Sequence, residues 1–166
     1  YGTQNATVFL LWNKGTDGVW YCIREYYYSG RTEGKQKTDS EYADDLESWL
    51  EETKIKGIIV DPSAASFIAE LRKRGYKVVK AKNNVEDGIR VVGTKLNQEA
   101  IIFADSCVNT IQEFGSYIWD EAAAAHGEDR PVKEHDHAMD ALRYFVYTIL
   151  NNQTAIIRSK RKAGFH

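Results

Sequence analysis

The first thirty positions hold two apolar runs separated by a cluster of turn-forming residues. Ala6–Trp12 and Val19–Ser29 are rich in β-branched and aromatic side chains, whereas Asn13–Gly18 is mostly polar and contains two glycines. This arrangement predicts an antiparallel β-hairpin. The polar and mostly basic stretch Gly30–Lys37 follows and predicts an exposed loop.

A helical pattern begins at Asp39. Its apolar residues recur at helical spacing as far as Leu50, which is typical of an amphipathic helix. Seven acidic residues and no basic one lie between Asp39 and Glu52. They indicate that the other face of this helix is solvated.

Short apolar runs then alternate with further helical patterns. The predicted strands are Gly57–Val60, Tyr76–Lys80 and Ala100–Ala104, and the predicted helices are Ala64–Arg74, Glu86–Gln98 and Ser106–Phe114. Strands that alternate with helices favour an α/β sheet with parallel strands. Together with the hairpin, they predict a mixed sheet flanked by helices.

The C-terminal part of the chain holds one more helical pattern. From near Asp136 to about Asn151 the apolar residues recur three and four positions apart, which predicts an amphipathic helix. Tyr117–Lys133 fits either a loop or a second hairpin, and the basic residues 158–162 indicate a flexible tail. We therefore expect one domain over residues 1–150 and a basic tail over residues 151–166.

Composition narrows the class of protein. A hydrophobic content of 43% in 166 residues supplies a core and argues against disorder, and the net charge of -2 excludes a uniformly basic DNA-coating protein. Cys22 and Cys107 have no neighbouring cysteine, which argues against a disulfide scaffold or a cysteine-rich zinc module. With no apolar run near the roughly 20 residues of a membrane span, we expect a soluble, intracellular domain.

Asp61 is the first candidate functional residue. It directly follows a predicted buried strand, and open α/β sheets place their ligand sites at the carboxyl ends of strands. A structural role as N-cap of the next helix is equally compatible with the sequence, although Ser63 would serve as well.

The second candidate is the segment from Asp136 to Asp140. Asp136 and Asp140 are neighbours on one helix face, and His137 lies three positions before Asp140. Two carboxylates and an imidazole can bind a divalent cation. Asp136 is also a good N-cap, and the helix dipole favours acids in a first turn. Taken alone, this segment fits the structural role better.

Basic residues concentrate between Leu71 and Lys82, where six occur without an acid. Those near the end of a helix are favoured by its dipole, but Lys80 and Lys82 lie beyond the predicted strand. We expect them to hold a phosphate backbone across Asp61.

Two other sets of residues do not match known motifs. Gly30–Lys35 lacks the spacing and the hydroxyl residue of a phosphate-binding loop, and the histidines form no zinc-binding pattern with either cysteine.

Several short motifs occur in order along the chain: Tyr1–Thr7, Val60–Ala64, Lys80–Ile89, Glu113–Tyr117, Glu128–Lys133 and Asp136–Tyr144. Together they resemble the C-terminal nuclease domain of the large terminase subunit of tailed bacteriophages, over roughly residues 1–150. The run Asp-His-Ala-Met-Asp-Ala-Leu-Arg-Tyr at 136–144 is specific enough to outweigh the structural reading of that segment.

The resemblance implies a ribonuclease-H-like fold and an endonuclease that cuts concatemeric viral DNA during packaging. It implies two divalent cations, Mg²⁺ or Mn²⁺, with Asp61 and Asp140 as catalytic metal ligands and His137 beside them, binding metal, orienting the nucleophile or moving a proton. The basic residues expected at the DNA are Lys80, Lys82, Lys133, Arg31 and Lys35.

The implied partners are double-stranded DNA, the terminase ATPase domain, the portal and the small terminase subunit, in the host cytoplasm at the procapsid. In the family a first catalytic Asp, on a central strand, lies immediately before the Tyr-Gly-Thr that starts this chain. We expect residues upstream of Tyr1 to supply this Asp and the central strand that carries it. The usual Asn before Asp-His is His135 here. The alternatives are a non-catalytic DNA-binding module and a motor- or portal-docking module.

Overall fold

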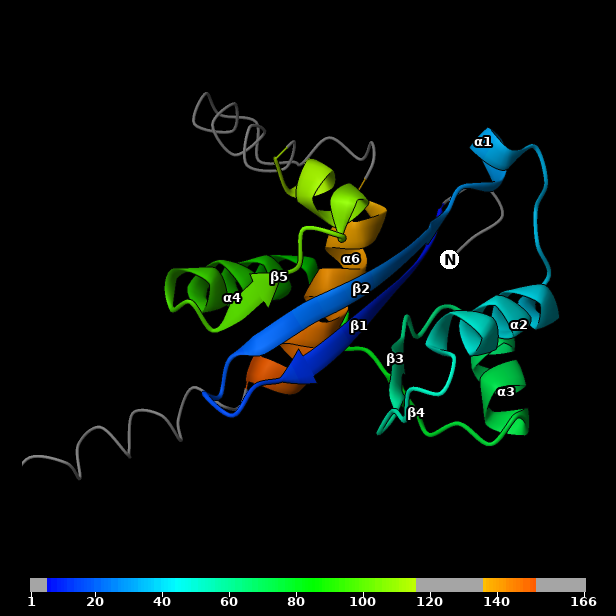
Figure 1. Cartoon of the computed structure of the whole chain (residues 1–166), viewed down its shortest axis with the longest axis horizontal. Coiled ribbons are helices and arrows are strands. Elements are labelled where there is room, and N and C mark those ends of the chain that lie inside the picture. Colours follow the sequence, from blue (N-terminus) through cyan, green and yellow to red (C-terminus); the bar gives the residue numbers. More distant parts are fainter. Residues whose placement is uncertain (1–5, 116–135, 152–166) are drawn as a thin grey trace, which may run out of the picture.

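The computed structural model describes residues 6–115 and 136–151 of the chain (Figure 1). The predicted hairpin is confirmed: β1 (Thr7–Lys14) pairs antiparallel with β2 (Trp20–Tyr28). The connection reverses through Gly18, whose φ of 84° favours glycine. The Asp17 carboxylate fixes the turn by accepting a hydrogen bond from the Val19 amide at 2.9 Å.

A β-bulge interrupts the hairpin. The register shifts between Leu11 and Trp12, whose partners are Arg24 and Cys22, so Ile23 has no partner on β1. The extra residue changes the alternation of side chains along β2. As a result Cys22, before the bulge, faces the same side of the hairpin as Glu25 after it, where both contact the region around residues 107–110.

The remaining strands are short and parallel. β5 (Ile101–Phe103) extends the hairpin sheet in the order β1-β2-β5, and β3 (Ile58–Val60) pairs with β4 (Val78–Lys80) in a second sheet. The helices are α1 (Gly30–Glu33), α2 (Asp39–Leu50), α3 (Ala65–Lys73), α4 (Val85–Asn97), a helix at 108–115 and α6 (His137–Phe145). The π-helical segment η1 (Val146–Leu150) continues α6.

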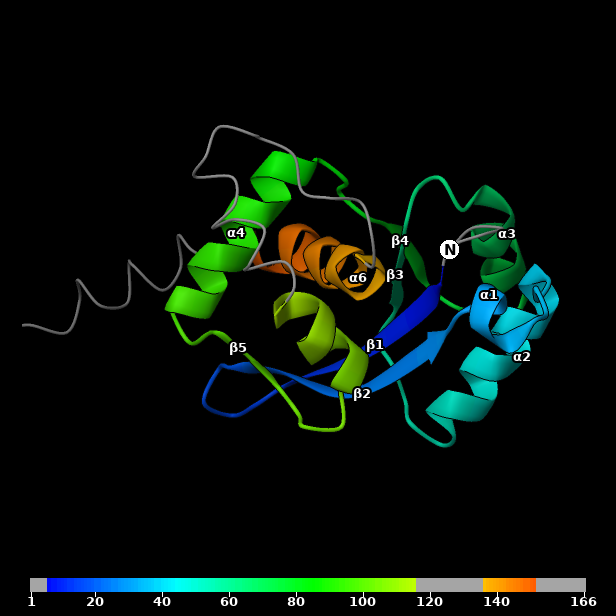
Figure 2. The same ribbon diagram turned by 90° about the horizontal axis from the view of Figure 1, so that it is seen from above.

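The hairpin lies between two hydrophobic cores. One core packs α2 and α3 against Phe9 and Leu11 of β1, and the other packs α6 against Val8 and Leu10 of the same strand. Figure 2 shows α2 and α3 on one side of the hairpin and α4 and α6 on the other. The alternating side chains of β1 therefore serve both cores, as expected for a strand buried on two faces.

Most predicted elements are confirmed, including the mixed sheet of an antiparallel hairpin and parallel strands with flanking helices. The prediction of a loop over Gly30–Lys37 is wrong in part, because α1 forms one helical turn that ends at Gly34 with a φ of 66°. The expectations for Tyr117–Lys133 and for the tail at 152–166 lie outside the described residues.

Within residues 6–115 and 136–151, no helix is long and apolar enough to cross a membrane. Cys22 and Cys107 are buried and free, with their sulfur atoms 3.7 Å apart.

Candidate functional site

A groove of about 860 Å³ separates the two sheets. It is lined by β1, by β3 with Asp61, and by α6 with His137, Asp140 and Tyr144. Among the described strands, β1 pairs only with β2 and β3 only with β4, so each borders the groove with an unpaired edge. The groove is therefore lined mainly by apolar residues along β1 and β3, and by polar residues near Asp61.

Asp61 lies at the carboxyl end of β3, as the sequence predicts. Its Oδ1 accepts a hydrogen bond from the Ser63 amide at 2.9 Å, and its Oδ2 accepts one from the Tyr144 hydroxyl at 2.9 Å. Burial raises the pKa of the Asp61 carboxyl, but the hydrogen bonds from Ser63 and Tyr144 outweigh burial and leave this pKa below its ordinary value. Asp61 is therefore an ionised carboxylate held from two sides.

The proposed alternative role of Asp61 or Ser63 as helix N-cap is wrong. The N-cap position of α3 is Ala64, and no side chain caps that helix. The Asp61 carboxylate instead closes an Asx-type turn onto the Ser63 amide, while the Ala64 amide donates to the Asp61 carbonyl at 3.0 Å. This turn directs the chain away from β3 and leaves the carboxylate at the groove.

Asp140 lies in the first turn of α6 and borders the same groove. Its Oδ1 accepts a hydrogen bond at 2.7 Å from Arg143, whose side chain is only 8% exposed, whereas that of Asp140 is 43% exposed. Arg143 also donates to the carbonyl of Asn83 at 3.1 Å, just before α4. The guanidinium therefore holds one carboxylate oxygen of Asp140 by a bond stronger than a neutral one.

His137 and Asp136 begin α6. His137 lines the groove, and its Nδ1 lies 3.9 Å from Asp136 Oδ1. Asp136 occupies the N-cap position, but its side chain makes no capping hydrogen bond. The alternative structural role considered for Asp136 is therefore only half met: the residue stands at the N-cap position, but its carboxylate does not cap the helix.

The cap comes from a distant residue. Glu113, in the helix at 108–115, accepts hydrogen bonds from the amides of Ala138 at 2.7 Å and Met139 at 3.2 Å. The sequence carries no local signal for this contact because Glu113 lies 25 positions before Ala138. Arg143 and Tyr144 likewise belong to the motif at 136–144, from which no role could be assigned to them.

The structure thus places Asp61, Asp140 and His137 along one groove. Within the described ranges, however, no three acidic, histidine or cysteine side chains lie close enough together to hold a metal ion. Two carboxylates still fit a hard divalent cation, because Mg²⁺ is commonly bound through one or two carboxylates together with substrate phosphates.

The candidate DNA-binding residues differ in their surroundings. Lys80 ends β4 and is exposed, and the Lys82 amide donates to Thr148 Oγ1 at 3.0 Å, which ties this segment to η1. Lys35 instead forms an ion pair with Glu41 at 2.7 Å, and Arg31 lies exposed on α1. Lys133 lies outside the described residues.

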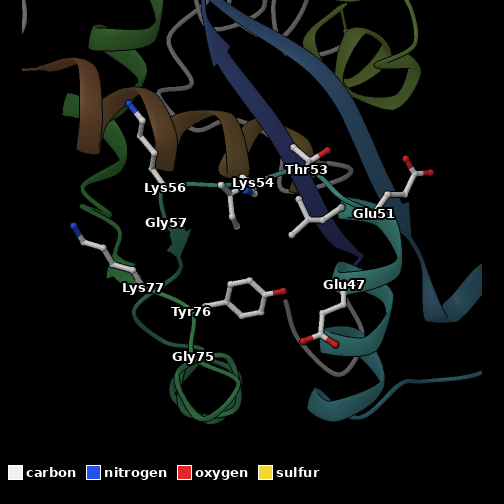
Figure 3. Close-up of a pocket in the computed structure, with 11 residues that line it drawn as sticks. Glu47, Glu51, Thr53, Lys54, Lys56, Gly57, Gly75, Tyr76 and Lys77 are labelled. Atoms are coloured by element: carbon white, nitrogen blue, oxygen red, sulfur yellow. The ribbon is translucent and has the colours of Figure 1, made fainter.

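A second pocket, of about 530 Å³, lies at the amino ends of β3 and β4, away from Asp61. Figure 3 shows the Tyr76 hydroxyl directed toward Glu47 of α2, whereas Lys56 and Lys77 extend away from it. Burial raises the pKa of Tyr76, and the negative charge of Glu47 raises it further. This pocket is lined by Glu47 and Glu51 together with three lysines, and it contains neither Asp61 nor Asp140.

The chain is similar to known proteins over most of its length. No family model matches it. It is 28% identical over 153 residues to the terminase large subunit of Escherichia phage T5, which covers 90% of this chain and 33% of that protein. It is 58% identical to the large terminase of a thermophilic bacteriophage, solved in complex with ATP-gamma-S, with a TM-score of 0.83 over 90% of this chain.

A second crystal form of the same thermophilic-phage terminase gives 58% identity and a TM-score of 0.82. The chain spans about a third of the length of these proteins, 33% of the T5 protein and 38% of the thermophilic-phage chain. The structural match agrees with the predicted ribonuclease-H-like mixed sheet flanked by helices. The chain is therefore homologous to a part of the large subunit of phage terminases.

Proposed function

We propose that this chain forms most of a nuclease domain that hydrolyses DNA with the help of divalent cations during phage genome packaging. One observation carries the proposal: Asp61 and Asp140, 79 positions apart (140 − 61), border the same groove at the carboxyl end of β3. Homology to large terminase subunits supports the link to packaging.

Adjacent residues of α6 hold the two carboxylates. Arg143 donates to Asp140 and Tyr144 donates to Asp61, so a single helix supplies one carboxylate and fixes both. Catalytic groups need side chains that are locked in place by their neighbours. The bonds that Arg143 and Tyr144 make hold the two acids in a defined arrangement at the groove.

In this proposal Asp61 and Asp140 hold the cations, and His137 contributes a ligand or accepts a proton. When bound, divalent cations generate a hydroxide nucleophile and stabilise the leaving oxygen of a phosphodiester. Asp61 suits this role because it is an ionised carboxylate at the end of β3, held in place by the hydrogen bonds from Ser63 and Tyr144. Lys80 and Lys82 hold the DNA backbone beside it through phosphate contacts that carry no sequence information.

The groove also supports the expectation of a further strand. The edges of β1 and β3 that border it are unpaired among the described strands, and unpaired edges are ready to pair with an extended segment. A strand inserted there would complete one sheet from β4 to β5. Its carboxyl end would bring a third acid beside Asp61, where the resemblance expects it.

The test is cleavage of plasmid DNA in Mg²⁺ or Mn²⁺ by the protein together with its upstream residues. Asp61→Asn and Asp140→Asn are expected to abolish nicking while circular dichroism and the melting temperature show a folded protein. Asp105→Asn is the matched control, because Asp105 lies in an exposed turn outside the groove. Wild-type cutting rates in either site variant would remove that carboxylate from the mechanism.

One finding favours a non-catalytic DNA-binding module as the second candidate: the described residues contain no three-ligand cluster. This module would bind DNA in the presence of a chelator and never cut it. The same plasmid assay, run beside a binding assay with and without the chelator, separates the two functions.

A further inference from the structure

The first turn of α6 is held by a carboxylate from another helix. Glu113 is 7% exposed, and its Oε2 accepts the hydrogen bonds from the Ala138 and Met139 amides at 2.7 and 3.2 Å. Its Oε1 accepts a hydrogen bond from the Tyr27 hydroxyl at 2.9 Å. Both oxygens of a nearly buried carboxylate are therefore used.

This contact replaces the ordinary cap. The first amides of a helix have no partner within the helix, and a negative charge at that end is also favoured by the helix dipole. Asp136 stands in the position from which a side chain usually supplies this partner, yet it makes no capping bond. Removing a buried acceptor leaves desolvated donors behind, so losing Glu113 loosens the start of α6.

The capped amides lie inside the site. Ala138 and Met139 are the two residues between His137 and Asp140, so a bond to their amides fixes the backbone that carries both groove side chains. From the other end, Arg143 ties the same turn to the carbonyl of Asn83. Glu113 thus acts on the groove through the backbone, without lining the groove itself.

We propose that Glu113 is a positioning residue: it caps α6 from a distance, holds His137 and Asp140 at the groove, and leaves the Asp136 carboxylate free of the capping role. The functional part of this inference rests on the nuclease function proposed above. Groups that orient metal ligands typically change metal affinity or activity by about 10–100-fold when they are removed.

The chain contains a matched control. Glu41 of α2 accepts a hydrogen bond from the Thr38 amide at 2.8 Å. It holds the start of a helix that packs on the other side of the hairpin, and it does not line the groove. Glu113→Ala and Glu41→Ala therefore each remove a carboxylate from a helix start, and only one of these starts carries the candidate site.

The first measurement is hydrogen exchange by mass spectrometry on the metal-free protein with its upstream residues. Exchange is compared at temperatures equally far below each variant's melting temperature. Glu113→Ala is expected to speed exchange at Ala138 and Met139 by at least about tenfold, because their amides lose their acceptor. Glu113→Gln keeps an acceptor oxygen and should restore most of the protection, and Glu41→Ala should leave these amides unchanged.

The second measurement is the Mg²⁺ concentration that gives half-maximal plasmid nicking. Glu113→Ala should raise it by about tenfold, whereas Glu41→Ala should leave it at the wild-type value. If Glu113→Ala does not fold, Glu113→Gln and Tyr27→Phe give the graded comparison, because each weakens the contact without removing it.

Three results would overturn parts of the scheme separately. Unchanged exchange at Ala138 and Met139 in Glu113→Ala would overturn the capping role. Faster exchange at these amides, with the Mg²⁺ dependence of nicking unchanged from that of Glu41→Ala, would make Glu113 a stabilising residue only, and the proposed nuclease function would stand. A wild-type protein that never cuts would overturn the nuclease function, and the functional half of this inference with it.

Discussion

Arg143 reaches Asp140 because residue 88 has no side chain. A Cβ atom at Gly88 would lie 2.5 Å from Cγ and 2.7 Å from Cδ of Arg143. Real Cβ atoms do not approach so closely, so either the arginine or α4 would have to move. The glycine thus secures a contact between two helices on which the orientation of the Asp140 carboxylate depends.

Gly88→Ala is therefore expected to destabilise the protein by about 1–3 kcal/mol, the usual range for overpacking a buried site. The measurement is the free energy of unfolding from denaturant titration. Gly93→Ala is the control, because Gly93 lies in the same helix and a methyl group added there would have no neighbouring atom within 4 Å. That control should gain about 0.5–1 kcal/mol from helix propensity. Equal effects at both positions would contradict the steric argument.

At the level of single residues, the sequence predicts which acidic residues form the candidate site, but not which groups form hydrogen bonds with them. Asp61 follows an apolar run and Asp140 sits at helical spacing from Asp136, and both patterns are local. The partner of Asp61 is Tyr144, 83 positions away, and that of the α6 amides is Glu113. Such pairings depend on how helices pack against strands, which local periodicity does not encode. For the same reason, the sequence does not show that the carboxylate capping α6 belongs to Glu113 and not to Asp136.

At the scale of elements, α2 shows how a short motif starts a helix. Thr38 accepts a hydrogen bond from the Glu41 amide at 3.3 Å, and Glu41 accepts one from the Thr38 amide at 2.8 Å. This is a capping box. Lys35 adds an ion pair to Glu41 at 2.7 Å and connects the chain after α1 to the helix start.

This cap makes the stability of α2 depend on pH. The hydrogen bond from Lys35, followed by those from Thr38, lowers the pKa of Glu41 from its ordinary 4.5 to about 2. A carboxyl group whose pKa is lowered by folding stabilises the folded state at pH values above the pKa that the group has in the unfolded chain. That stability is lost as pH falls from about 4.5 to about 2.

Glu41→Gln should therefore flatten the dependence of the free energy of unfolding on pH between about 5 and 2. Urea titrations at several pH values measure it. Glu52→Gln removes one charge from an exposed position just after α2 and serves as the control for net charge. Parallel pH profiles for wild type and Glu41→Gln would show that the capping box does not contribute in this range.

Elements with strong periodicity were predicted well, and their ends less so. α2 matches the predicted Asp39–Leu50, because apolar spacing and acids in the first turn agree there. β4 covers only Val78–Lys80 of the predicted Tyr76–Lys80, since it is limited by its three-residue partner β3. The groove between β1 and β3 could not be predicted from propensities, which say which segments are strands but not which edges remain unpaired.

At the scale of the whole molecule, basic side chains that form no ion pair with a described acid are candidates for contacts with DNA phosphates. Lys80 and Lys82 follow the carboxyl edge of β4, and no described acid forms an ion pair with either. Lys35 and Lys37 are occupied by Glu41 and Asp45. Lys80 and Lys82 are therefore the basic side chains next to Asp61 that the proposed nuclease would use to hold a phosphate backbone.

Replacing both Lys80 and Lys82 with alanine should weaken binding to unrelated DNA sequences alike. The slope of log K against log salt should fall by up to about two units, because two fewer counterions are released. Binding titrations at several salt concentrations measure it. The control pair is Arg72 and Lys73, which are exposed near the end of α3 and do not line the groove. An unchanged slope in the Lys80 and Lys82 variant would place the DNA elsewhere, for example along Arg31.

The bulge at Ile23 constrains how this chain is able to vary over evolution. Beyond it, Glu25 reaches the amides of Asn109 and Thr110, and Tyr27 reaches Glu113. Loss or gain of one residue in β2 would turn the side chains of Glu25 and Tyr27 to the opposite face of the hairpin, toward α2. It would also turn Arg24 and Tyr26, which now contact α2, away from that helix. Related chains should therefore tolerate substitutions in β2 far better than changes in its length, and lineages that do change it should show a compensating shift in the opposite strand.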